Sequence, residues 1–112
     1  MDISVRHRSA VQILQLRGDL KLGEAVDKFR ETTEELIAAG ESRFVLNLSE
    51  TRMIDSSGIG ALMRLVTSAS KQNGSVKLVS PSGFAVRTLK LVGLLRLFEV
   101  FDDENLAVES FH

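Results

Sequence analysis

Two adjacent serines, Ser56 and Ser57, are the residues whose type and position best suit chemistry in this chain. They follow Asp55 and precede Gly58, between an apolar run typical of a buried strand and an apolar stripe with helical spacing. A hydroxyl at such a strand-to-helix turn is exposed, close to free backbone amides and not flanked by bulky side chains. We therefore expect a serine there that another protein reads or modifies.

Helix capping is the alternative role for these serines. Serine is a preferred N-cap residue because its oxygen accepts a hydrogen bond from an amide of the first turn. Asp55 ahead of the helix would add a charge that the macrodipole favours. One cap requires one serine, however, and two stand here. Gly58 and Gly60 are a second anomaly, since glycine inside a helix costs about 0.5–1 kcal/mol relative to alanine. A close approach by another backbone would explain them.

The elements that position this turn are expected to alternate between strands and helices. Strands are predicted at residues 3–5, 11–16, 44–48, 76–79 and 97–101, with residues 7–10 connecting the first two as a hairpin. Helices are predicted at residues 22–37, 57–71 and 84–92, followed by a short terminal helix that Asp102 caps and that carries Leu106 and Val108. This order is typical of an α/β domain with a mostly parallel sheet of about five strands and four helices.

The apolar spacing also predicts which residues face the core. Leu22 and Leu91 belong to the apolar stripes of the first and third helices. The strand at 44–48 is almost wholly apolar, as expected of a central parallel strand that is covered on both faces. Sites in open α/β sheets lie at the carboxyl ends of strands, and residues 53–60 fall at such an end.

Composition excludes several classes of function. The chain of 112 residues suits one domain, residues 1–112, and 44% of it is hydrophobic, which is enough for a proper core. The absence of cysteine excludes disulfides, thiol nucleophiles and cysteine metal ligands. A net charge of −1 gives no basic field that would recruit nucleic acid or anionic lipid. No apolar stretch approaches the ~20 residues of a membrane span, and no secretory leader is visible. We therefore expect a cytoplasmic protein without membrane insertion.

No enzymatic constellation accompanies Ser56. His7 and His112 are not paired in the sequence with a plausible nucleophile, and Ile54 rules out a G-x-S-x-G elbow around the serine. Neither glycine-rich phosphate-binding motif is present, so no cofactor is expected. A hydrolase that uses Ser56 is therefore the least favoured interpretation, and we expect a protein that is not an enzyme.

The run from Asp55 to Gly60, DSSGIG, closely resembles the phosphorylation loop of STAS domains, above all that of bacterial anti-sigma-factor antagonists. The resemblance extends to the turn at residues 18–20, the strand at 44–49 and residues 86–101, and so covers nearly the whole chain. It implies a single STAS-type domain.

The resemblance also implies a partner switch. An antagonist with a free serine binds an anti-sigma factor that is also an ATP-dependent serine kinase, and thereby frees a sigma factor. Phosphorylation of the serine ends the binding, and a separate serine phosphatase restores it. By position in the motif the acceptor is Ser56, with Ser57 as second choice. A homodimer is a further assembly to consider. The residues expected to meet the partner are Asp19, Lys21, Met53, Asp55, Ser57, Gly58 and Ile59.

Physical chemistry is consistent with such a switch. A phosphate adds about −1.5 to −2 charges, which the amides and macrodipole of a helix N-terminus tolerate. A partner packed over the loop would not tolerate it, because burying an unpaired charge costs several kcal/mol. We therefore expect phosphorylation to preserve the fold and to abolish binding.

Two positions depart from the family pattern. Lys21 stands where an aspartate often meets an arginine of the kinase, and Asn47 stands where an aspartate is common. Both favour an alternative, a STAS adaptor in a stressosome-type scaffold or a lipid-transport complex. For an antagonist, Lys21 predicts a partner with an acidic or neutral residue at the facing position.

Overall fold

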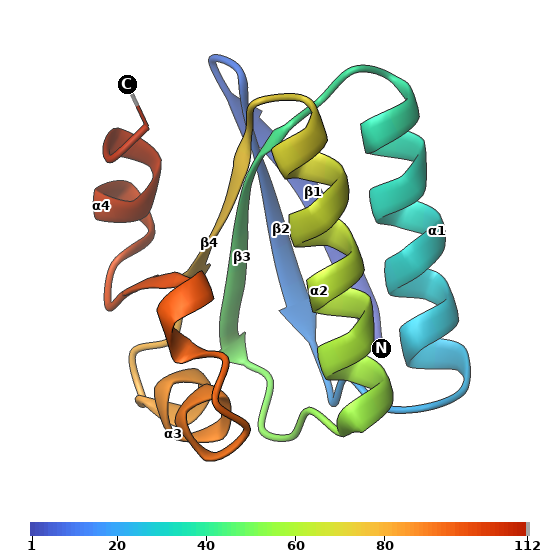
Figure 1. Cartoon of the computed structure of the whole chain (residues 1–112), viewed down its shortest axis with the longest axis vertical. Coiled ribbons are helices and arrows are strands. Elements are labelled where there is room, and N and C mark those ends of the chain that lie inside the picture. The colour runs from blue at the N-terminus through green and yellow to red at the C-terminus, as the bar shows by residue number, and fades with distance from the viewer. Residues whose placement is uncertain (112) are drawn as a thin grey trace.

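A five-stranded sheet runs through the centre of the molecule in the order β1-β2-β3-β4-β5 (Figure 1). The computed structural model describes residues 1–111. The strands are β1 (Asp2–Arg8), β2 (Val11–Arg17), β3 (Arg43–Glu50), β4 (Ser75–Val79) and β5 (Glu99–Phe101). β1 and β2 pair antiparallel as a hairpin, and the remaining neighbours pair in parallel.

The helices lie on both faces of this sheet. They are α1 (Glu24–Ala38), α2 (Ser56–Lys71), α3 (Phe84–Leu91) and α4 (Glu104–Glu109), with a 3-10 turn η1 (Leu95–Leu97). α1 and α2 lie side by side on one face, whereas α4 lies on the other (Figure 1). The predicted α/β fold with an initial hairpin is therefore confirmed.

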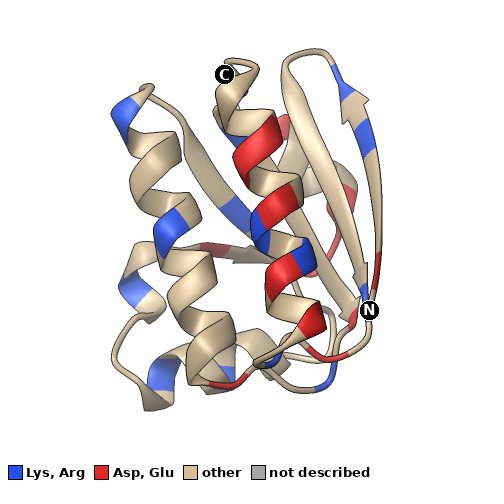
Figure 2. Cartoon of the chain, turned by 90° about the vertical axis from the view of Figure 1, so that its right-hand side faces the viewer, with Lys and Arg blue, Asp and Glu red and all other residues tan. Residues whose placement is uncertain are grey.

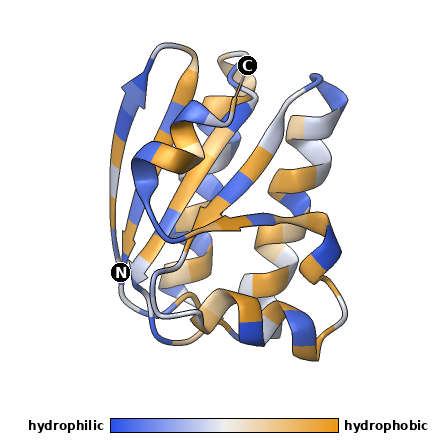
Figure 3. Cartoon of the chain, turned by 90° about the vertical axis from the view of Figure 1, so that its left-hand side faces the viewer, coloured by the Kyte–Doolittle hydropathy of each residue, from blue (hydrophilic) through white to orange (hydrophobic). Residues whose placement is uncertain are grey.

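Alternation along β3 divides the core between these two layers. Phe44, Leu46 and Leu48 point into the larger core beneath α1 and α2. Val45 points the other way and packs with Val108 of α4 in a smaller core. The whole apolar run is buried, as predicted for a strand covered on both faces. Figure 3, which faces α4, shows the hydrophobic strand segments lying behind it.

Two apolar residues that the pattern placed in helical stripes are exposed instead. Leu22 is 75% exposed and precedes α1, because Gly23 has a φ of 112° and the helix begins after it. Leu91 is 88% exposed at the last turn of α3. Spacing alone does not separate a core position from a helix end, since the neighbouring element that would cover it is not encoded locally.

The last strand and its helix also differ from the prediction. Residues 95–97 form η1, so the strand is limited to the three residues of β5. The N-cap of α4 is Asp103 and not Asp102, because the Asp103 carboxylate accepts hydrogen bonds from the amides of Asn105 and Leu106. Leu106 is 56% exposed, whereas Val108 is buried.

Candidate functional site

Two loops meet at the carboxyl ends of β2 and β3 and form one surface (Figure 1). We call them the β2–α1 loop (residues 18–23) and the β3–α2 loop (residues 51–55). The amide of Leu20 donates to the Met53 carbonyl at 3.0 Å, and the amide of Asp55 donates to the Leu20 carbonyl at 3.2 Å. Leu20 and Ile54 pair as an isolated bridge and are buried beneath the surface. The loops are therefore held together as a continuation of the sheet.

Asp55 links the two loops and starts α2. Its Oδ1 accepts a hydrogen bond from the Gly58 amide at 2.9 Å, and its Oδ2 accepts one from the Leu22 amide at 2.9 Å. The Leu22 and Gly58 amides hold the pKa of this carboxyl below its ordinary value, and the charge of Lys21 lowers it further. Asp55, and not a serine, is therefore the N-cap of α2, and the serine-capping interpretation is wrong.

The serines are left without a capping role. Ser56 is the first residue of α2 and is exposed, whereas Ser57 is half-buried. A hydroxyl that does not cap the helix can be modified without the loss of a native hydrogen bond at the helix start. This difference between the two serines favours Ser56 as the accessible one.

The two glycines of the motif have different surroundings. A Cβ on Gly58 would lie 2.3 Å from the Leu20 carbonyl oxygen and 2.9 Å from the Ile54 side chain. The close backbone that Gly58 requires is therefore that of the β2–α1 loop, and Gly58 itself is buried. Gly60 is exposed and has nothing within 4 Å of the equivalent position. The fold supplies no reason for a glycine there.

The remaining residues expected to meet a partner lie on the same two loops or on the first turn of α2. Met53 is 41% exposed, Lys21 is exposed, and Asp19 and Ile59 are half-buried. Leu22, which the apolar spacing had placed in the core, adds an exposed apolar side chain to this surface. The glycine that follows Leu22 is the signal that could have placed it outside the helix.

Asn47 lies elsewhere, on the α4 face of the sheet. Its Nδ2 donates to Glu104 Oε1 at 3.1 Å, and its Oδ1 accepts from the Ser49 amide at 3.0 Å. Glu104 also forms an ion pair with Arg6 at 2.8 Å, and the Arg6 hydrogen bond is the main reason that the pKa of Glu104 is lowered. An aspartate at position 47 would face this carboxylate. The departure at Asn47 thus has an internal explanation.

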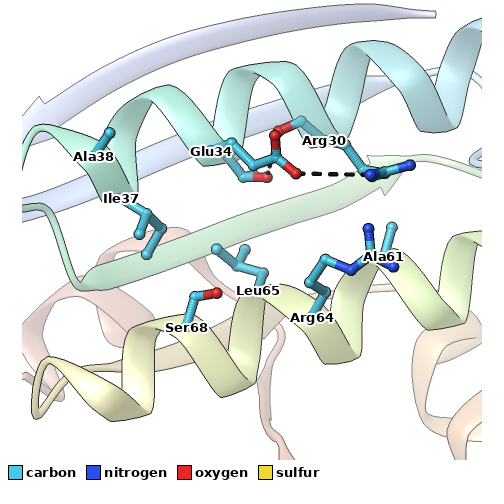
Figure 4. Close-up of a pocket in the computed structure, with 9 residues that line it drawn as sticks. Arg30, Glu34, Ile37, Ala38, Ala61, Arg64, Leu65 and Ser68 are labelled. Atoms are coloured by element: carbon cyan, nitrogen blue, oxygen red, sulfur yellow. Dashed lines mark hydrogen bonds and ion pairs between the residues drawn. The ribbon is translucent and has the colours of Figure 1, made fainter.

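A shallow groove of about 150 Å³ separates α1 from α2 (Figure 4). Arg30 and Glu34 of α1 form an ion pair across its edge at 3.8 Å, and Arg64 of α2 lies opposite (Figure 4). Residues 1–111 contain no group of three or more histidines and carboxylates arranged to hold a metal ion. None of the helices in this range has the length and apolar character needed to cross a membrane.

Known proteins share this fold and part of this sequence. The model of the STAS domain family matches residues 2–107. A Thermotoga maritima protein named as a candidate anti-sigma factor antagonist is 32% identical over 77 residues, which cover 69% of this chain and 68% of that protein.

Solved structures extend the comparison. The crystal structure of a candidate anti-sigma factor antagonist from Thermotoga maritima superposes with a TM-score of 0.87 at 28% identity, over 96% of this chain and 92% of that chain. The phosphorylated form of the Bacillus cell fate determinant SpoIIAA superposes with a TM-score of 0.78 at 19% identity, over 99% of this chain and 100% of that chain. The second likeness is one of fold alone.

Proposed function

This chain belongs to the STAS domain family and its anti-sigma-factor antagonists, and on that premise we propose that phosphorylation of Ser56 controls its binding to an anti-sigma factor. The observation that carries the proposal is the division of roles at the start of α2. Asp55 caps the helix and joins the two loops, while Ser56 presents an exposed hydroxyl that the fold does not use.

The surface around Ser56 is suited to a partner that lies flat over both loops. Leu22 and Met53 offer exposed apolar side chains, and Asp19 and Lys21 offer charges that select the facing residues. Exposed Gly60 would let a partner backbone approach α2 closely. These residues, with Asp55, Ser57 and Ile59, are the binding surface that we propose, and the buried Gly58 supports it from beneath.

A phosphate on Ser56 would disrupt such an interface and not the fold. It would bring about −1.5 to −2 charges to a covered surface, where an unpaired charge costs several kcal/mol. On the free protein the same group points into water, so the helix and the loops persist. Each ~1.4 kcal/mol lost from the interface weakens binding about tenfold.

The proposed partners follow from this switch. An anti-sigma factor that is also an ATP-dependent serine kinase would transfer the γ-phosphoryl group to the Ser56 oxygen and release ADP, and a serine phosphatase would remove it by hydrolysis. The chain acts as a binding partner and substrate and not as an enzyme. Its site of action would be the cytoplasm, where sigma factors meet RNA polymerase, without direct contact to nucleic acid. We propose that residues 1–112 form one STAS domain.

Phosphorylation by the cognate anti-sigma kinase with ATP, mapped by mass spectrometry, tests the proposal. We expect phosphate on Ser56, no incorporation into Ser56→Ala, and normal incorporation into the matched variant Ser57→Ala. Phosphate chiefly on Ser57, or on neither serine, would contradict the assignment.

A further inference from the structure

Lys21 is held beside Asp55, the residue before Ser56, by its two neighbours in the chain. The carbonyl of Leu20 accepts the Asp55 amide at 3.2 Å, and the amide of Leu22 donates to the Asp55 carboxylate at 2.9 Å. Lys21 lies between these two anchors, and Ser56 directly follows Asp55. Two hydrogen bonds thus fix the backbone on either side of Lys21 against Asp55, which immediately precedes Ser56.

The charge of Lys21 is available at this position. Lys21 is exposed and takes part in no ion pair with the residues that the structure describes. Its charge reaches the adjoining carboxylate, since it is among the causes that lower the pKa of Asp55. Arg52, the cation of the other loop, is not among those causes.

A phosphate on Ser56 would find the start of α2 already occupied by an anion. The Asp55 carboxylate already accepts a hydrogen bond from the Gly58 amide of the first turn, so this donor is engaged. The phosphate would also lie next to the Asp55 carboxylate, which repels it. A cation from another element would therefore stabilise a dianion in this place.

We propose that Lys21 is the internal counter-ion of the phosphorylated state, and that its ammonium group pairs with the phosphate on Ser56 of the same chain. The inference rests on Ser56 being the phosphorylated residue. It extends the proposed function, because one phosphorylation then changes two features of the binding surface. The phosphate adds negative charge, and the lysine that was open to a partner becomes engaged within the chain.

The charged groups on the elements around Ser56 are few. The β2–α1 loop carries Asp19 and Lys21, the β3–α2 loop carries Arg52 and Asp55, and α1 begins with Glu24. The first turn of α2 has no charged side chain. Three of these five groups are acidic, so Lys21 and Arg52 are the two cations on these elements.

The test uses the full chain with phosphoserine incorporated at position 56 during synthesis, so that no kinase is needed. Phosphorus NMR then follows the second ionisation of the phosphate, whose ordinary pKa is about 6. An exposed ion pair predicts that Lys21→Gln raises this pKa by about 0.2–0.7. Lys21→Arg should keep the wild-type value.

The matched control is Lys71→Gln, which removes the same charge at the far end of α2. Ser56 and Lys71 are the first and last residues of this helix, about 22 Å apart along its axis, and salt screens that distance almost fully. An unchanged pKa in Lys21→Gln, or an equal rise in Lys71→Gln, would overturn the inference. Failure of the kinase to modify Ser56 would instead refute the proposed function alone, because the phosphate here is built in.

Discussion

Gly58 and Gly60 lie two positions apart in one helix but have different roles. The fold requires a glycine at position 58, whereas only a partner would require one at position 60. A Cβ at Gly58 would lie 2.3 Å from the Leu20 carbonyl oxygen, which is backbone and cannot swing away. Gly58→Ala should therefore lower the free energy of unfolding by about 1–3 kcal/mol. Denaturant unfolding followed by circular dichroism measures this loss.

Gly60→Ala is the matched variant on the open side of α2. Nothing lies within 4 Å of the added methyl group, so the free energy of unfolding should rise by about 0.5–1 kcal/mol from the gain in helix propensity. If a partner backbone approaches here, the same variant should bind the anti-sigma factor more weakly. A Gly58→Ala protein as stable as wild type, or undiminished binding by Gly60→Ala, would contradict these assignments.

The sequence predicted the residues of this turn better than their roles. The order of Asp55, Ser56 and Gly58 identified the turn, but aspartate and serine are almost equally good N-caps. Asp55 becomes the N-cap because the Leu22 amide, which belongs to the β2–α1 loop, donates a hydrogen bond to the second carboxylate oxygen of Asp55. That contact spans 33 positions in the chain, and no local pattern encodes it.

At the scale of elements, α4 is a short helix held to the sheet by polar contacts as well as by apolar ones. Asn47 and Arg6 both hydrogen-bond to its Glu104. Asn47→Asp would set a second carboxylate against Glu104 in a half-buried place and raise the pKa of Glu104. We expect the variant to lose about 1–3 kcal/mol of unfolding free energy at pH 7.

The loss should shrink as the pH falls below about 5, because one proton bound between the two carboxylates removes the repulsion. Denaturant unfolding at pH 7 and pH 4.5 compares the two states. Asn105→Asp is the control, since the same change there faces Arg8 and should alter stability by about 0–1 kcal/mol. Two results would contradict this account of α4. One is an Asn47→Asp variant whose free energy of unfolding at pH 7 equals that of wild type, and the other is a loss of stability that grows on acidification.

Hydrophobic patterning predicted the alternation of strands and helices, because each strand around β3 buries an almost continuous apolar run. It did not predict the short β5 or the 3-10 turn before it. Leu97 is apolar yet 41% exposed, so its position depends on how η1 packs and not on its spacing. The ends of elements are set by tertiary contacts, and those are absent from a local pattern.

The whole molecule segregates charge in a way that its net charge of −1 conceals. α1 carries five acidic residues and the two cations Lys28 and Arg30, whereas the only charged residues of α2 are the cations Arg64 and Lys71 (Figure 2). A partner that lies along both helices would therefore meet a mostly acidic helix beside a basic one. Such a pattern orients an approaching protein without requiring a large net charge.

Calorimetric titration of the cognate anti-sigma factor with two forms of the full chain tests the central claim most directly. One form carries serine at position 56 and the other carries phosphoserine, with circular dichroism to establish that both are folded. Burial of the phosphate should cost about 3 kcal/mol or more, so we expect at least about 100-fold weaker binding by the phosphorylated form. Equal affinities for two folded forms would show that Ser56 does not control the interface.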